Sequence, residues 1–70
     1  MEEVKVFYDR EGHTLTVWFG DPQDESVCEE TGDEVILIKD KHGRVIGFEK
    51  LNYLLPEGRS LRLALETTAI

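Results

Sequence analysis

The sequence predicts a mainly β fold, an antiparallel meander sheet of five to six strands with a possible short helical segment near the C-terminus. Apolar and polar side chains alternate at every second position in several runs, which is the period of a strand rather than of a helix. These runs are rich in β-branched and aromatic residues, which favour strands. Clusters of Gly, Asp and Pro separate the runs and indicate turns.

The first half of the chain is expected to begin with a hairpin over 4–9 and 14–19. Its turn, Asp9–His13, contains Gly12, which can adopt a positive φ without steric cost. Pro22 lacks an amide donor and marks a loop after the second strand. A weaker strand is expected over 26–31, before the turn residues around Gly32.

The middle of the chain contains the most buried-looking strand, 34–39. Its run Val35–Ile38 is apolar throughout and is typical of a central strand covered on both faces. Gly43 is the expected left-handed residue of the next turn, and 44–51 continues as a strand. If consecutive strands pair, one face carries Val6, Tyr8, Leu15, Val17 and Phe19, and the other carries Phe7, Trp18, Ile46 and Phe48.

The C-terminal tail, 52–70, leaves alternatives open. Residues 51–55 are a candidate helical turn, ended by Pro56 because the residue before a proline avoids the α region. Leu61, Leu63 and Leu65 alternate with Arg62 and other residues and favour a sixth strand. A helix over about 60–68 is the alternative, because the residues there are good helix formers.

With 70 residues, the chain has room for a single small domain, 1–70, and one core. A sheet that is apolar on both faces must bury each face against another layer. The tail can pack on the sheet or on a partner, and a second copy can close the other face, so we expect a homodimer.

The expected location is the cytoplasm. Cys28 is the single cysteine, so an internal disulfide is excluded and a reducing compartment fits. The acidic start, Met1-Glu2-Glu3, differs from the basic start of a signal peptide. No apolar run has the length of a membrane span, so no membrane association is expected.

The chain is acidic, with 15 Asp and Glu against 8 Lys and Arg and a formal charge of -7. This charge repels phosphate backbones and anionic lipids, so nucleic acid is not an expected partner. One interpretation of the acidic segment 21–34 is a solvated edge strand that charge protects from pairing. The other is a docking face for a basic protein. The candidate interaction residues are Asp21, Asp24, Glu25, Glu29, Glu30, Asp33, Glu34 and, outside the segment, Trp18.

No pattern in the sequence predicts a catalytic, cofactor or metal site. Zinc needs four converging ligands, and His13, His42 and Cys28 are the only soft or borderline ligands available. In a meander the two histidines occupy turns at opposite ends of the sheet. Each is therefore interpreted as a solvated turn residue, and the cysteine as a small strand residue.

Asp21, Asp24 and Glu25 are hard oxygen ligands, but their spacing matches no known calcium or magnesium loop. They should lie at the same end of the sheet as Lys41 and Arg44, where charge compensation explains them. No phosphate-binding loop or nucleophile elbow is present in the sequence.

Several short segments resemble a known family. They are Val6-Phe7-Tyr8-Asp9, Leu15-Thr16-Val17, Val35-Ile36-Leu37 and the stretch from Asp40 through Gly43-Arg44-Val45-Ile46-Gly47-Phe48-Glu49. Together, over about residues 6–51, they resemble the family called domain of unknown function 2283, short prokaryotic proteins. The chain departs from that pattern at His13, where Asp is usual, and at Thr16, where Tyr is common. The resemblance implies a small β domain without an assigned role, some members being encoded beside toxin-like proteins.

The expected function is therefore a noncatalytic protein-interaction module, with a basic and toxin-like protein as one partner to be neutralised. The alternative is a small-ligand or metal site at a homodimer interface, where a histidine from each chain, His13 or His42, converges. A purely structural subunit of a larger assembly is the third option.

Overall fold

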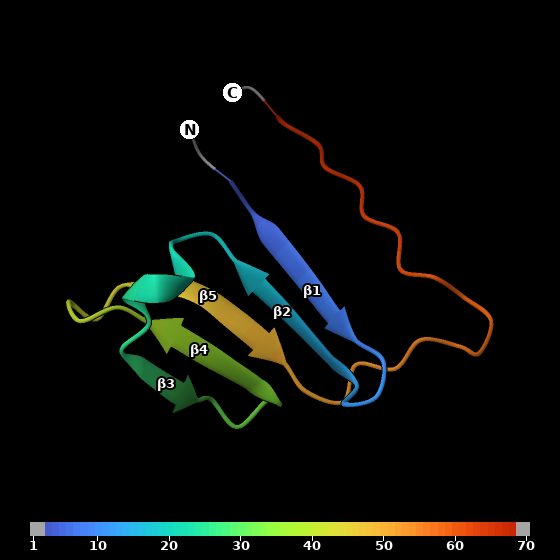
Figure 1. Ribbon diagram of the computed structural model, residues 1–70, viewed down its shortest axis with the longest axis horizontal. Helices are drawn as coiled ribbons and strands as arrows, with labels where there is room; N and C mark the ends of the chain where they lie inside the picture. The colour runs from blue at the N-terminus through green and yellow to red at the C-terminus, as the bar shows by residue number, and fades with distance from the viewer. Residues whose placement is uncertain (1–2, 69–70) are drawn as a thin grey trace.

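Residues 3–68 are described by the computed structural model, and they form one antiparallel sheet of five strands (Figure 1). The mainly β prediction is confirmed. Residues 1–2 and 69–70 of the predicted domain, with Met1 and Glu2 of the acidic start, lie outside the described residues. The elements are β1 Lys5–Asp9, β2 Thr14–Trp18, the 3-10 turn η1 Pro22–Asp24, β3 Val27–Glu30, β4 Val35–Lys39 and β5 Val45–Lys50.

The strand order is β1-β2-β5-β4-β3, so the sheet joins a hairpin to a three-stranded meander. Consecutive strands pair as expected except at one step, because β2 pairs with β5 instead of β3. The loop that contains η1 carries the chain across the ends of β5 and β4 (Figure 1). This order leaves the acidic β3 at an edge, where its carboxylates stay hydrated, and places the more apolar β4 and β5 inside.

An aspartate side chain organises the β1–β2 turn. The carboxylate of Asp9 accepts hydrogen bonds from the backbone N–H of Glu11 and Gly12, at 3.0 and 3.1 Å. The left-handed residue of this turn is His13, with φ 56°, and not Gly12 as predicted. The chain reverses at His13 because β2 begins at the next residue. Gly43 does adopt the predicted left-handed conformation, with φ 79°.

The cross-strand register sets the two faces of the sheet. Val17 lies opposite Val6 on one side and Phe48 on the other, so these side chains share a face. The prediction that placed Phe48 with Phe7 is therefore wrong, because it did not include the β2–β5 pairing. We call this side of the sheet the valine face, and its apolar members include Val6, Tyr8, Leu15, Val17, Val35, Leu37 and Phe48.

The core is small. Among the described residues, the buried hydrophobic side chains are Ile38 and Ile46. The other apolar residues of β4, Val35–Leu37, are only half-buried, so the expected cover on both faces of this strand is absent within residues 3–68. The valine face is likewise half-buried along its length. The sheet is thus a single layer with little material on either side.

The tail forms neither the sixth strand nor the helix considered above, since residues 53–68 contain neither element. Asn52 reverses the chain with φ 56°, and the Tyr53 N–H then donates to the carbonyl of His13 at 2.8 Å. The tail therefore leaves the sheet at the β1–β2 turn (Figure 1). Pro56 and Gly58 interrupt its first part, and the remaining stretch is too short to form a stable helix without packing.

Candidate functional site

The seven predicted acidic residues lie along one edge of the sheet, from η1 through β3 to the turn before β4. All seven are exposed, as are all four residues of β3. They do not converge on one point, because Asp24 and Asp33 lie beyond opposite ends of β3. We call this set the acidic edge, and it comprises Asp21, Asp24, Glu25, Glu29, Glu30, Asp33 and Glu34.

Some of these carboxylates are occupied by local contacts. Asp21 caps η1 by accepting from the Gln23 N–H at 2.9 Å. Glu29 pairs with Lys39 of the neighbouring strand at 3.0 Å. By contrast, the side chains of Asp24, Glu30 and Asp33 make no hydrogen bond or ion pair with other residues in the range 3–68. Those three carboxylates are available to a partner.

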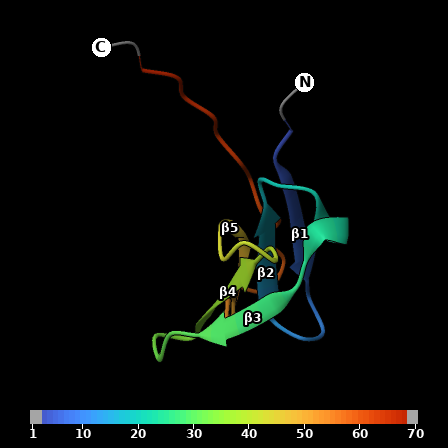
Figure 2. The same ribbon diagram turned by 90° about the vertical axis from the view of Figure 1, so that its left-hand side faces the viewer.

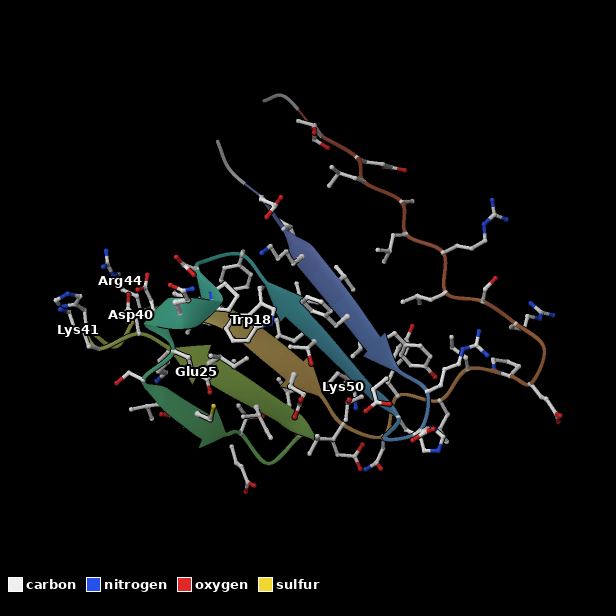
Figure 3. The ribbon with its side chains drawn as sticks, in the orientation of Figure 1. Trp18, Glu25, Asp40, Lys41, Arg44 and Lys50 are labelled. Carbon is white, nitrogen blue, oxygen red and sulfur yellow. The ribbon has the colours of Figure 1, made fainter. Side chains whose placement is uncertain are left out.

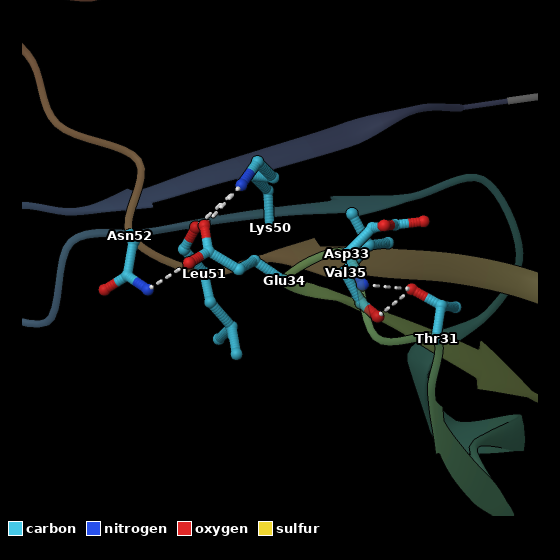
Figure 4. Close-up of polar contacts among 7 residues, drawn as sticks. All are labelled: Thr31, Asp33, Glu34, Val35, Lys50, Leu51 and Asn52. Carbon is cyan, nitrogen blue, oxygen red and sulfur yellow. Dashed lines mark hydrogen bonds and ion pairs between the residues drawn. The ribbon is translucent and has the colours of Figure 1, made fainter.

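Glu34 connects the β3–β4 turn to the end of β5 (Figure 4). Its carboxylate lies 3.3 Å from the Lys50 ammonium and accepts from the Asn52 side-chain amide at 3.1 Å. Its carbonyl accepts from the Leu51 N–H at 2.7 Å. The residue adopts φ 61°, in the left-handed region. These contacts indicate a structural role at the corner of the acidic edge.

Cys28 points its thiol at the carboxylate of Glu25, which accepts at 3.1 Å. This hydrogen bond is the largest cause that raises the pKa of the Cys28 thiol, with loss of hydration and the nearby charges of Glu25 and Glu49 acting in the same direction. The thiol is exposed and stays protonated at neutral pH. It is therefore a poor nucleophile despite its accessibility.

Asp40 and Arg44 form the best-organised polar cluster, in the β4–β5 turn. The Asp40 carboxylate accepts from the N–H groups of His42 and Arg44 at 2.9 and 3.0 Å. It also pairs with the Arg44 guanidinium at 3.1 Å. The Arg44 N–H is the largest cause that holds the pKa of Asp40 below its usual value. Sequence reasoning identified Asp40 only as a turn residue, and its Asp-x-x-Gly spacing carries no further signal.

An open pocket of about 390 Å³ separates this turn from η1. The predicted proximity of the acidic loop to the basic turn residues is thus confirmed, as Figure 3 shows for Asp40, Lys41 and Arg44 beside η1. The predicted charge compensation does not take the form of an ion pair within residues 3–68, since Arg44 pairs with Asp40 and not with the loop. The lining residues are Gln23, Asp24, Glu25, Ser26, Asp40, Lys41, His42 and Arg44.

Trp18 lies apart from the acidic edge, on β2, where it pairs with Gly47 across the sheet. It is half-buried on the face opposite Val17. The eight predicted interaction residues therefore divide into a continuous edge and one aromatic residue on a different strand.

The two histidines occupy opposite ends of the sheet, as expected. His13 ends the β1–β2 turn, and His42 lies in the β4–β5 turn (Figure 1). Within the part of the chain that is described, no group of three or more His, Cys, Asp or Glu residues is arranged to hold a metal ion. None of the helices in residues 3–68 is long and apolar enough to cross a membrane.

Comparison with known proteins gives one match. A family model described as "Protein of unknown function (DUF2283)" covers residues 5–53. No curated protein and no solved structure matches the chain. The matched region begins at the first residue of β1, contains all five strands and ends at Tyr53, where the tail departs. The chain therefore belongs to the DUF2283 family of proteins of unknown function.

Proposed function

We propose that the domain is a noncatalytic interaction module that uses its acidic edge to bind a basic protein and thereby neutralise it, a toxin-like protein being one such partner. The observation that carries the proposal is the exposure of β3, an edge strand whose four residues all contact solvent. An edge strand offers unpaired backbone groups to an incoming extended segment. Carboxylates around it select a segment that carries Lys or Arg.

Some carboxylates of the acidic edge have structural contacts and others are free, which supports this role. Asp21 and Glu34 hold the loop and the turn in place, while Asp24, Glu30 and Asp33 keep their carboxylates free of contacts within residues 3–68. Glu30 lies in β3, and Asp24 and Asp33 lie before and after it. The three free carboxylates therefore line the path of an added strand. We place the protein in the cytoplasm, a compartment in which the exposed Cys28 thiol stays reduced.

The test is a titration with a defined probe, a nine-residue peptide of alternating Lys and Val, followed by backbone NMR shifts. We expect shifts concentrated on Val27–Glu30, and an affinity that falls as salt rises. The variant Asp24→Asn, Glu30→Gln, Asp33→Asn should bind at least about tenfold more weakly, since each lost charge contact contributes a fraction of the binding free energy.

The matched control is Glu3→Gln, Glu11→Gln, Glu57→Gln, which removes the same net charge from exposed positions away from β3. It should retain most of the affinity. Equal loss in both variants, or shifts spread over the whole surface, would mean that the peptide responds only to net charge and would overturn the proposal.

A further inference from the structure

The end of the tail, residues 60–68, is a segment that we call the arm; within the described residues it forms no strand or helix and makes no hydrogen bond to the sheet. The last anchor of the tail is the carbonyl of Arg59, which accepts from the Arg10 guanidinium at 3.1 Å. Beyond this point the chain is extended and leaves on the side of the sheet opposite η1 (Figure 2). Leu63 and Leu65 have exposed fractions of 69% and 94%. These alternating leucines give the arm one apolar side, as in a strand with one apolar face.

The outer edge of β1 is the complementary feature. β1 is the terminal strand of the sheet and pairs only with β2 among the described strands. Its outer backbone groups are therefore a template for one more strand. The neighbouring Val4 and Phe7 are 63% and 56% exposed, so apolar side chains border this edge. The edge has none of the carboxylate density that protects β3.

In one antiparallel register of residues 62–66 on β1, opposite charges face each other and apolar side chains share a face. With Ala64 opposite Phe7, Arg62 lies opposite Asp9 and Glu66 lies opposite Lys5, so both charged pairs are attractive. In the same register Leu63 and Leu65 lie beside Tyr8 and Val6 and extend the valine face.

Other alignments lose these pairs. A slip of two residues in either direction removes the Asp9–Arg62 and Lys5–Glu66 pairs, and a slip of one moves the leucines to the opposite face. A parallel alignment of the same segments sets Arg62 against Lys5 and Glu66 against Asp9, where like charges repel. The charge pattern therefore selects a single antiparallel register.

We infer that two copies of this chain exchange their arms, so that residues 62–66 of each copy pair with β1 of the other in this register. Within residues 3–68 the tail does not pair with the β1 of its own chain, so the tail segment and the β1 edge are both open to a second copy. Exchange pairs both open β1 edges, and it extends the small sheet of a domain whose buried hydrophobic side chains, within residues 3–68, are Ile38 and Ile46. A reciprocal exchange is closed and two-fold, so every contact forms twice.

Cysteine cross-linking of the full chain tests both the partner and the register. Phe7→Cys with Ala64→Cys, in a Cys28→Ser background, places two thiols directly opposite each other across the exchanged strands. Oxidation should give a reducible species of twice the 8.0 kDa of one chain. The control pair Phe7→Cys with Thr68→Cys is out of register by four residues, roughly 14 Å along a strand, and should cross-link poorly. Phe7 is exposed, so its replacement should leave the fold intact, which circular dichroism checks.

A charge-reversal experiment provides a second test. Arg62→Glu with Glu66→Lys should raise the dimer dissociation constant by at least about tenfold, since four cross-strand pairs become repulsive in the dimer. Adding Lys5→Glu alone should recover part of the affinity, because it restores the two attractive pairs with position 66 and leaves the Asp9 turn intact. Light scattering that finds an 8.0 kDa monomer at millimolar wild-type protein, or oxidation that gives only an intrachain disulfide, would overturn the inference. Arm exchange uses β1 and peptide binding uses β3, so either proposal can fail without the other.

Discussion

Trp18 of β2 lies against Gly47 of β5, its direct partner across the sheet. A Cβ added at position 47 would lie 3.2 Å from Trp18 Cε3 and 2.6 Å from the carbonyl oxygen of Val17. The second neighbour is backbone and cannot move without disturbing the β2–β5 pairing. This contact joins the N-terminal hairpin to the three-stranded meander.

Gly47→Ala should therefore destabilise the domain by about 1–3 kcal/mol, the usual cost of inserting a methyl group into a tightly packed position. The measurement is urea unfolding followed by Trp18 fluorescence. Gly12→Ala is the control for the added methyl group, because the three atoms nearest to its Cβ belong to the Asp9 side chain and not to backbone. Equal stability of Gly47→Ala and the wild type would contradict the close approach.

Asp40 should make the stability depend on pH in the acid range. Hydrogen bonds from Arg44 and His42 lower the pKa of the folded carboxyl below its value in the unfolded chain. The carboxylate thus contributes stability above the unfolded pKa, and that contribution is lost as pH falls through the folded pKa. Asp40→Asn should be less stable than the wild type at pH 7, with a difference that shrinks below pH ~4. Thermal unfolding between acid and neutral pH measures this. Asp33→Asn, whose side chain makes no hydrogen bond or ion pair within residues 3–68, is the control for removing one exposed carboxylate.

The Cys28 thiol should react slowly with a disulfide reagent despite its exposure. Its raised pKa leaves a smaller thiolate fraction at a given pH than in an ordinary thiol. Glu25→Gln removes the charged acceptor and should move the pH–rate profile to lower pH. Asp24→Asn is the control, since its side chain does not contact the sulfur within the described structure. Identical profiles for Glu25→Gln and the wild type would exclude the thiol–carboxylate hydrogen bond.

Two substitutions at Glu34 should distinguish the cost of its left-handed backbone from the contribution of its side-chain contacts. Glu34→Gly relieves the left-handed backbone while losing the exposed pair with Lys50, so its stability should stay within about 1 kcal/mol of the wild type. Glu34→Val loses the pair and places a β-branched residue at φ 61°, which should cost roughly 1–3 kcal/mol. Urea unfolding of both variants gives the comparison. Similar losses for Gly and Val would assign the effect to the side chain alone.

The sequence predicted the strands well because each has its own local signature. Alternation identified the β1–β2 hairpin, and the apolar run Val35–Ile38 identified β4. The Asp9 and Asp40 turns were also local, since both aspartates bind amides within four residues. The feature that was predicted wrongly is a nonlocal one. The pairing of β2 with β5 depends on which strands bury more surface together, and no short pattern encodes it.

The prediction of a strand in the tail was wrong for a related reason. Leu61, Leu63 and Leu65 carry a clear strand period, but a strand also needs a neighbour, and the chain carries them away from its own sheet. The acidic edge was predicted as a segment of sequence, yet the free state of Glu30 and the occupied state of Glu29 depend on cross-strand partners such as Lys39. Local charge counts do not distinguish the two.

The carboxylates of β3 also set a limit on how far such sheets can grow. Open edges invite stacking into fibrils, but two β3 edges that meet would bring Glu29 and Glu30 of one copy beside those of the next. Mutual repulsion at neutral pH stops that growth. The net charge of the chain vanishes near the isoelectric point, about 4.6, so colloidal solubility should be lowest there.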